Sequence, residues 1–170
     1  MPRISFSTKD GLGELSFNAK GVSSVELPEV GRLPGDEKID HLPGMENAAL
    51  AAELLRQYFK GEPVYFDDVK VDLSGHSPFF NEVCEQVRSI PVGQVMSYAK
   101  VASLIGKRGS ARAVGRVMAN NPVPIIVPCH RVVAADGRLT GYSAAGGLET
   151  KAALLSMEGV ELREEGRVVL

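Results

Sequence analysis

Residues 122–131 constrain this chain more than any other segment, because they read PVPIIVPCHR. Three prolines restrict the backbone, so the segment is stiff. The branched aliphatic residues between the prolines predict a buried, apolar path through the protein. That path ends at two adjacent residues that can carry chemistry, Cys129 and His130.

The Cys129–His130 pair predicts a nucleophilic cysteine. A thiol reacts as its thiolate, and a free cysteine with a pKa of about 8.5 is mostly protonated at neutral pH. An adjacent base, acting directly or through a water, is the usual way to activate it. The alternative is an inert core cysteine beside a structural histidine, which is common for buried cysteines. The stiff apolar surroundings favour the reactive pair.

Composition limits the class of protein. A chain of 170 residues, 44% hydrophobic and 24% charged, is typical of one globular domain or two small ones. Two cysteines, Cys84 and Cys129, are too few for a disulfide framework or a four-cysteine zinc site. The three histidines, His41, His76 and His130, lie far apart in the chain. We therefore expect no metal and no cofactor.

The first residues and the apolar runs of the chain bear on its location in the cell. The first residues lack the apolar core of a signal peptide, and no apolar run approaches the length that spans a membrane. We therefore expect a reduced protein in the cytoplasm, or the nucleus of a eukaryote, that does not contact membranes.

Charge is segregated along the chain. Residues 1–85 contain 15 acidic and 8 basic side chains. Residues 86–135 contain no acidic residue and seven basic ones: Arg88, Lys100, Lys107, Arg108, Arg112, Arg116 and Arg131. A solvated helix face normally mixes both signs, so this block predicts a surface that binds a polyanion.

The first part of the chain predicts a small antiparallel sheet with one helix, over residues 1–73. Alternating segments at 4–7, 15–17 and 22–27, separated by turn residues, predict a β-meander. Residues 28–44 predict a loop. Apolar residues at helical spacing predict a helix over 46–60, which ends before Gly61 and Pro63. We expect an α/β protein overall.

Residues 74–160 predict a second, mostly helical domain. Ser77, Ser97 and Ser110 are good N-cap residues for helices that follow them, and Cys84 is expected in the core of the first. The helices over 98–105 and 110–119, joined by a glycine-containing turn, form a helix-turn-helix pattern. A last helix is expected over 149–158 with Leu148, Ala152 and Leu155 inward. Residues 161–170 are expected to be a tail.

Residues 77–159 resemble the O6-alkylguanine-DNA alkyltransferases, also called methylated-DNA–protein-cysteine methyltransferases. The matching stretches are IPVG at 90–93, SY at 97–98, ARAVG at 111–115, NPVP at 121–124, PCHRVV at 128–133, DG at 136–137, TGY at 140–142 and GGL at 146–148. A weaker resemblance, through YFKG at 58–61 and DLSG at 72–75, covers the first half. The resemblance implies a ribonuclease H-like amino-terminal domain and a winged helix-turn-helix in the carboxy-terminal domain.

The resemblance also implies a reaction. Cys129 would take the alkyl group from guanine O6 by direct displacement, irreversibly and once per molecule. His130 would link Cys129 to Glu158 through a water and favour the thiolate, and Tyr98 would donate a proton to the departing guanine. The damaged nucleotide must be flipped out, because O6 cannot be attacked inside a duplex.

The resemblance further assigns the pocket and the DNA surface. Five residues would form or border the alkylguanine pocket: Asn121, Pro124, Val132, Tyr142 and Ser143. Arg112 would fill the gap left by the flipped nucleotide, and the surrounding DNA contacts would come from Lys107, Arg108, Ala111, Gly115 and Arg116. The implied partner is double-stranded DNA carrying O6-alkylguanine, approached from the minor groove by a monomer.

Two other functions are weighed against this one. A non-enzymatic sensor of alkylated DNA on the same scaffold would lack the acceptor cysteine, so the presence of Cys129 argues against it. A thiol hydrolase or redox enzyme would need an acyl-binding oxyanion site or a resolving cysteine, and Cys84 in a helix core is a poor candidate for the latter.

Overall fold

The computed structural model describes residues 1–32, 42–163 and 166–170, which form two compact units. The first unit contains Met1–Gly75 and Pro122–Ile126, and the second contains His76–Asn121 and Val127–Leu170. Part of the PVPIIVPCHR segment therefore groups with the first unit, although the sequence pattern suggested a break only near residue 73. His41 and most of the loop expected at 28–44 lie outside the described residues.

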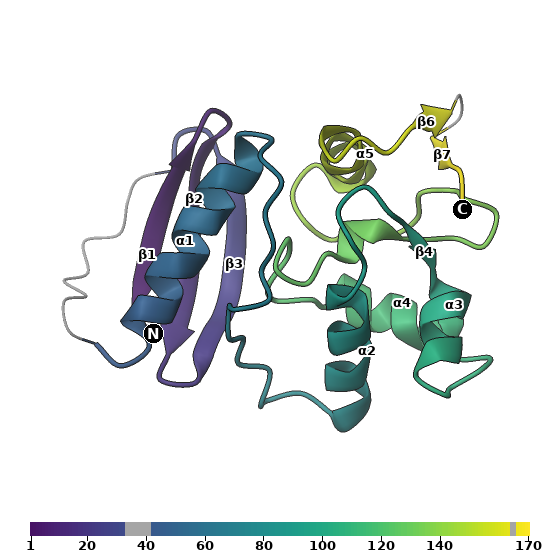
Figure 1. Cartoon of the computed structure of the whole chain (residues 1–170), viewed down its shortest axis with the longest axis horizontal. Coiled ribbons are helices and arrows are strands. Elements are labelled where there is room, and N and C mark those ends of the chain that lie inside the picture. The colour runs from purple at the N-terminus through teal and green to yellow at the C-terminus, as the bar shows by residue number, and fades with distance from the viewer. Residues whose placement is uncertain (33–41, 164–165) are drawn as a thin grey trace. The chain divides into compact units, whose positions relative to one another are not determined.

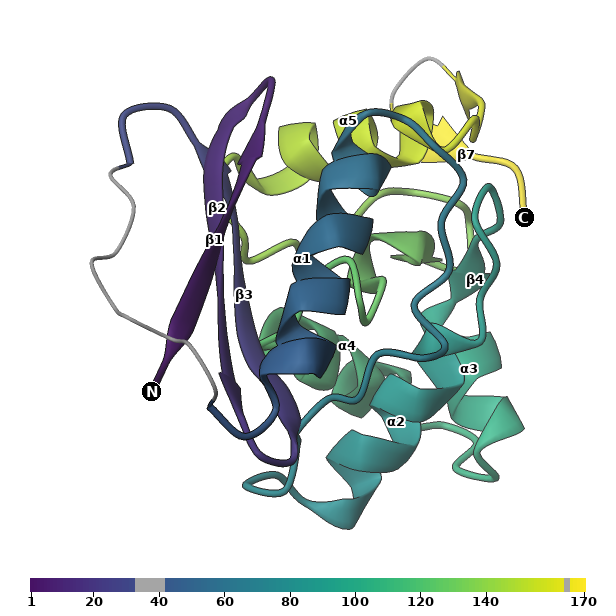
Figure 2. The same cartoon turned by 60° about the vertical axis from the view of Figure 1, so that its left-hand side comes forward.

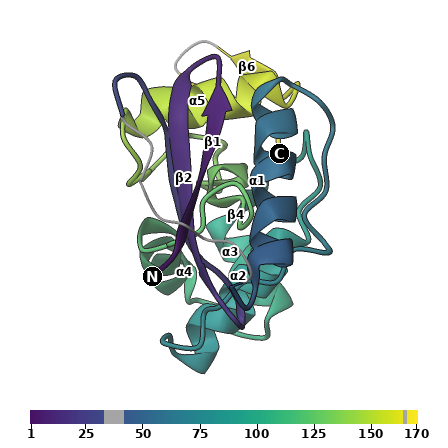
Figure 3. The ribbon, with the colours of Figure 1, turned by 90° about the vertical axis from the view of Figure 1, so that its left-hand side faces the viewer.

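The first unit is built on an antiparallel meander, as the sequence predicts (Figure 1). Its strands, in sheet order, are β1 (Arg3–Thr8), β2 (Gly11–Asn18) and β3 (Gly21–Glu29). Helix α1 (Met45–Phe59) lies along one face of this sheet (Figure 3). Phe6 of β1 stacks on Phe59 of α1 with ring centroids 6.4 Å apart. The helix predicted over 46–60 is confirmed.

Small side chains let α1 pack closely on the sheet. Ala48, Ala51 and Ala52 are buried on its inner face together with Leu55. The returning segment Pro122–Ile126 joins the same unit, where the Val25 amide donates to the Pro122 carbonyl over 2.8 Å. Val123, Pro124, Ile125 and Ile126 are all buried. The prediction of a buried apolar path is confirmed for this segment.

Three helices pack together in the second unit (Figure 2). They are α2 (Pro78–Arg88), α3 (Tyr98–Leu104) and α4 (Ala111–Ala119). The Ser77 and Ser97 hydroxyls each accept an amide hydrogen bond of 3.2 Å at the start of α2 and α3, as predicted. Ser110 is the N-cap residue of α4, as predicted, but its hydroxyl makes no capping hydrogen bond to the helix. Cys84 is fully buried in α2, as expected.

A short parallel pair of strands positions the chemistry in the second unit. Strand β4 (Met96–Ser97) pairs with β5 (Val132–Val133). A single turn of 3₁₀ helix, η1 (Cys129–Arg131), leads directly into β5, and Tyr98 directly follows β4. The pairing therefore brings the start of α3 beside the residues that follow Cys129.

The remaining elements of the second unit are a helix and a hairpin. They are α5 (Gly147–Met157), β6 (Leu162–Arg163) and β7 (Arg167–Val168). Residues 161–170 were expected to be a tail, but Val168 packs with Val133 and Leu155 in a small core. No helix among the described residues is long and apolar enough to cross a membrane.

Gly13 offers a test of the packing between β1 and β2. It lies opposite Phe6, and a Cβ built on it would come within 2.2 Å of the Phe6 ring. We expect Gly13→Ala to lower the free energy of unfolding by about 1–3 kcal/mol through overpacking, measured by urea denaturation. Gly75→Ala is the matched control, because no atom lies within 4 Å of its Cβ position. Equal stability of the two variants would contradict the close packing of Phe6.

Candidate active site

Cys129 lies at the end of a strained and buried approach. It is only 6% exposed, and its amide donates to the Val127 carbonyl over 2.8 Å. Among the described residues other than glycine, Ile125 alone has a positive φ, of 72°. A β-branched residue in this conformation is an outlier that only its surroundings can maintain, and such strain concentrates at functional sites.

The Asn121 side chain braces the end of that approach. Its Nδ2 donates to the Val127 carbonyl over 2.8 Å, which ties α4's exit to the residues before Cys129. Burial raises the pKa of the Cys129 thiol, while a hydrogen bond from Asn121 and the charge of Lys151 lower it. The net effect is a raised pKa, so the thiol stays protonated until a base removes its proton.

His130 directly follows Cys129 in η1. Its ring is fully buried, and Nε2 lies 2.7 Å from Oε1 of Glu158 at the C-cap of α5. Burial by itself raises the pKa of Glu158, but hydrogen bonds from His130 and Arg131 outweigh it and hold the pKa at about 2. An ionised carboxylate only accepts hydrogen bonds, so Nε2 carries the proton and Nδ1 carries the lone pair.

The His130 ring is neutral in this arrangement. Burial lowers the pKa of His130, and the positive charges of Arg131 and Lys151 also lower it. The hydrogen bond and negative charge of Glu158 act in the opposite direction. The net shift is downward. A neutral imidazole that carries its lone pair on Nδ1 is a form that can accept a proton there.

Arg131 belongs to this cluster and not to the basic surface block predicted from the charge pattern. Its Nε and Nη2 donate to the two oxygens of Glu158, each over 2.9 Å, and its Nη1 donates to the Ile90 carbonyl over 2.6 Å. The Arg131 side chain is 7% exposed. Counting charges along the chain could not separate a buried ion pair from a surface cation.

Lys151 is a second buried cation that the sequence analysis missed. It is fully buried in α5, and its Nζ donates to the carbonyls of Val132 over 2.6 Å and Thr140 over 2.9 Å. Burial lowers the pKa of Lys151 to about 8, against the opposing influence of Cys129. The prediction that Leu148 points inward is wrong, because Leu148 is 47% exposed and Lys151 occupies the buried face instead.

Two tyrosines approach the thiol. The Tyr98 hydroxyl donates to the Thr140 carbonyl over 3.1 Å, and a Cβ on Gly115 of α4 would lie 3.8 Å from the Tyr98 ring. The Tyr142 hydroxyl is buried without a hydrogen-bond partner among the described residues, and burial and the nearby Cys129 raise its pKa. A buried hydroxyl with open hydrogen-bonding capacity marks a position that water or a substrate can satisfy.

The other predicted site residues differ in their exposure. Val132 is buried in β5, whereas Ser143 is exposed on the loop before α5. The side chains of Arg112 and Arg116 are exposed on α4, and Lys107 and Arg108 are exposed on the turn before it. Ala111 and Gly115 are half-buried on α4. Pro124 is buried in the segment that groups with the first unit.

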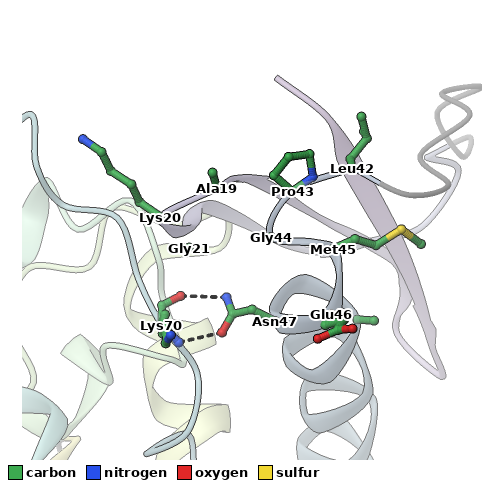
Figure 4. Close-up of a pocket in the computed structure, with 11 residues that line it drawn as sticks. Ala19, Lys20, Gly21, Leu42, Pro43, Gly44, Met45, Glu46, Asn47 and Lys70 are labelled. Atoms are coloured by element: carbon green, nitrogen blue, oxygen red, sulfur yellow. Dashed lines mark hydrogen bonds between the residues drawn. The ribbon is translucent and has the colours of Figure 1, made fainter.

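A cavity in the first unit has no reactive pair like Cys129 and His130 among the described residues that line it. It has a volume of about 660 Å³ at the start of α1, with Lys20, Asn47 and Lys70 among its lining residues (Figure 4). The Asn47 side chain is occupied by the backbone of Lys70, with bonds of 2.9 and 2.7 Å. The described residues that line this cavity include no cysteine or histidine, and no three potential metal ligands cluster anywhere in the described part of the chain.

Comparisons with known proteins agree with the site. The family model of the 6-O-methylguanine DNA methyltransferase DNA-binding domain matches residues 78–160. A methylated-DNA–protein-cysteine methyltransferase of Mycobacterium leprae is 37% identical over 147 residues, which cover 86% of this chain and 87% of that protein. The chain belongs to the methylated-DNA–protein-cysteine methyltransferase family. The resemblance inferred from the sequence is thereby confirmed.

Other members of the methyltransferase family support the assignment. A relative from Mycolicibacterium paratuberculosis is 47% identical over 108 residues, which span 64% of this chain and only 63% of that protein. The crystal structure of Mycobacterium tuberculosis OGT in complex with DNA matches with a TM-score of 0.72 and 33% identity, over 92% of each chain. These matches confirm an α/β fold with a small antiparallel sheet and helices.

The buried Glu158 carboxylate should make stability depend on pH. Its folded-state pKa of about 2 lies below the ordinary value of 4.5, so its contribution is complete above about 4.5 and is lost as the pH falls towards 2. At neutral pH we expect Glu158→Gln to lower the free energy of unfolding by about 3 kcal/mol. The difference from the wild type should shrink in acid, measured by urea unfolding across pH. The exposed Glu161→Gln variant is the control, and a pH-independent difference for Glu158→Gln would contradict the ion pair.

Proposed function

We propose that this chain is a DNA repair protein that transfers the alkyl group of O6-alkylguanine in duplex DNA to the sulfur of its own Cys129. The observation that carries the proposal is the buried His130–Glu158 pair, whose histidine directly follows the buried Cys129 in η1. The membership of the family and the DNA complex of the Mycobacterium tuberculosis relative support it.

The chemistry follows from the protonation states. His130 Nδ1 accepts the Cys129 proton through a water, and the thiolate attacks the alkyl carbon. A carbon–sulfur bond forms as the bond from carbon to O6 breaks, and the electron pair leaves with guanine. The Tyr98 hydroxyl donates a proton to the departing base, after giving up its bond to the Thr140 carbonyl. The Tyr98 phenolate then regains a proton through water from the His130 imidazolium, so the thiol proton ends on guanine and both side chains return to their neutral forms. The thioether product does not hydrolyse, so each molecule reacts once.

The surfaces around Cys129 have separate tasks in this proposal. Val132, Tyr142 and Ser143 border the flipped alkylguanine, and Asn121 and Pro124 hold the chain that leads into the pocket. The exposed Arg112 enters the stack from the minor groove in place of the flipped nucleotide, while α4 lies close to the DNA through Ala111 and Gly115. Lys107, Arg108 and Arg116 contact phosphates. The protein acts as a monomer.

The finer architecture is part of the same proposal. The meander with α1 corresponds to a ribonuclease H-like domain, and α3 and α4 correspond to a winged helix-turn-helix with α4 as its recognition helix. The short length of α3 and α4, and the exposed cations at the start of α4, support this assignment.

Two competing functions fit less well. A sensor that binds alkylated DNA without reacting does not need an acceptor thiol such as Cys129, nor a histidine held in place beside it by Glu158. A redox enzyme would need Cys84 as its second thiol, but burial raises the pKa of Cys84 to about 12 and leaves it unreactive at neutral pH.

The stoichiometry of the reaction tests the proposal. With an excess of duplex containing O6-methylguanine, repaired DNA should plateau at one equivalent of active protein, and mass spectrometry should find one methyl group on the Cys129 peptide. Cys129→Ser should bind the duplex without repairing it. Turnover beyond one equivalent, or methyl transfer by Cys129→Ser, would refute the proposal.

Arg112 can be tested by comparing two substrates. We expect Arg112→Ala to slow repair of duplex DNA by about tenfold or more, because unstacking a base costs a few kcal/mol, and to leave reaction with free O6-benzylguanine nearly unchanged. Arg116→Ala, from the same face of α4, should weaken duplex binding in a salt-dependent way without slowing repair at saturating protein. Equal losses on duplex and free base would show that the Arg112 variant only destabilises α4.

A further inference from the structure

We propose that Arg131 is a positioning residue that keeps the His130 imidazole neutral and therefore able to accept the proton of Cys129. The inference rests on the proposed alkyl transfer and deepens it. Arg131 does not touch the substrate in this account. It acts through Glu158, the carboxylate that it shares with His130, and through its own positive charge, which opposes a second positive charge on the ring.

The geometry of Arg131 leaves it almost no freedom. Three nitrogens of the guanidinium donate hydrogen bonds, two of them to the opposite oxygens of Glu158 and one to the Ile90 carbonyl. The side chains of Arg131 and Glu158 are 7% and 2% exposed. A bidentate pair fixes the plane of the carboxylate, which a single lysine ammonium cannot do.

That fixed plane also orients the His130 ring. Oε1 of Glu158 accepts from both His130 Nε2 over 2.7 Å and Arg131 Nη2 over 2.9 Å. Arg131 holds both carboxylate oxygens, and the ring nitrogen that faces Oε1 is Nε2. With the proton on Nε2, the lone pair of the neutral ring is on Nδ1, where the ring can accept a proton.

The balance of charges around His130 also favours a neutral ring. The titratable and charged groups that act on His130 or on its neighbours in this buried cluster are Tyr98, Cys129, Arg131, Tyr142, Lys151 and Glu158. Glu158 carries −1 and Arg131 carries +1, so the pair has no net charge to attract a proton to the ring. Lys151 adds a positive charge, but its ammonium is directed at the Val132 and Thr140 carbonyls.

Removing the charge of Arg131 would change the protonation of His130. The Glu158 carboxylate would then be a buried anion that has lost both of its hydrogen bonds from Arg131 and keeps the one from His130. A buried unpaired charge is strongly unfavourable, so the ring would take up a proton to compensate it. An imidazolium has no lone pair, and Cys129 would lose its base.

The experiment measures the pKa of His130 by NMR titration of the histidine rings, in the full-length protein without DNA. Substitution of His41 and His76 identifies their signals and thereby that of His130. Arg131→Gln removes the charge and keeps a donor towards Glu158, whereas Arg131→Lys keeps the charge and loses the bidentate geometry. We expect the pKa of His130 to rise in Arg131→Gln and to stay near the wild-type value in Arg131→Lys. Arg138→Gln, which removes an exposed arginine from the same unit, should change nothing.

Alkyl transfer provides a second readout. In Arg131→Gln the rate at neutral pH should fall by about 10²-fold and should recover as the pH rises, because deprotonation restores the base. A structural role would lower the rate by the same factor at every pH. An unchanged His130 titration in Arg131→Gln, or an equal shift in Arg131→Lys, would overturn the proposal.

A pair of variants covers the case in which Arg131→Gln does not fold. Glu158→Gln and the double variant Arg131→Gln/Glu158→Gln differ only in the charge of residue 131, and neither contains an uncompensated carboxylate. The pKa of His130 should be higher in the double variant, and equal values would overturn the proposal. Absence of alkyl transfer by the wild-type protein would refute the proposed function instead, and would leave the His130 titrations as a test of Arg131 alone.

Discussion

The Glu158 carboxylate is the interaction on which the rest of the site depends. It lies at the C-terminal end of α5, where the helix dipole disfavours an anion, and its side chain is only 2% exposed. Such a group is tolerable only when it is fully paired. Its partners His130 and Arg131 both come from η1, and Arg131 continues to the carbonyl that follows α2. Glu158 thus connects α5 to η1, and Arg131 extends this connection to the end of α2.

Buried side-chain-to-backbone bonds replace regular secondary structure around Cys129. Strands β4 and β5 contain two residues each and cannot hold the segment by their own ladder. The carbonyls of Val127, Val132 and Thr140 are satisfied by side chains of Asn121, Lys151 and Tyr98. Unsatisfied carbonyls at these positions would carry a desolvation cost, so these polar side chains stabilise an irregular backbone that the chemistry requires.

The sequence predicted the elements with strong local patterns and missed those that depend on distant partners. The meander, α1 and the helices that begin after Ser77 and Ser97 follow from periodicity and capping. Cys129 and His130 stand out because of their proline-rich approach. Lys151 and Arg131 could not be placed, because charged residues are almost always exposed unless a partner buries them, and their partners lie far away in the chain. The β6–β7 hairpin was missed for a related reason, since its Val168 amide pairs with the Gly137 carbonyl.

The raised pKa of Cys129 fits a protein that reacts once. A permanently ionised cysteine would react with oxidants and other electrophiles, because thiolate character and exposure set the rate of such damage. Cys129 is instead 6% exposed, and burial favours its thiol form. On the proposed mechanism the proton leaves only when His130 accepts it beside a bound alkylguanine. Every unproductive reaction would consume a whole protein molecule, so a protonated thiol beside a neutral base is the more useful arrangement. In the proposed mechanism His130 is that base, and the Arg131–Glu158 pair holds it in place.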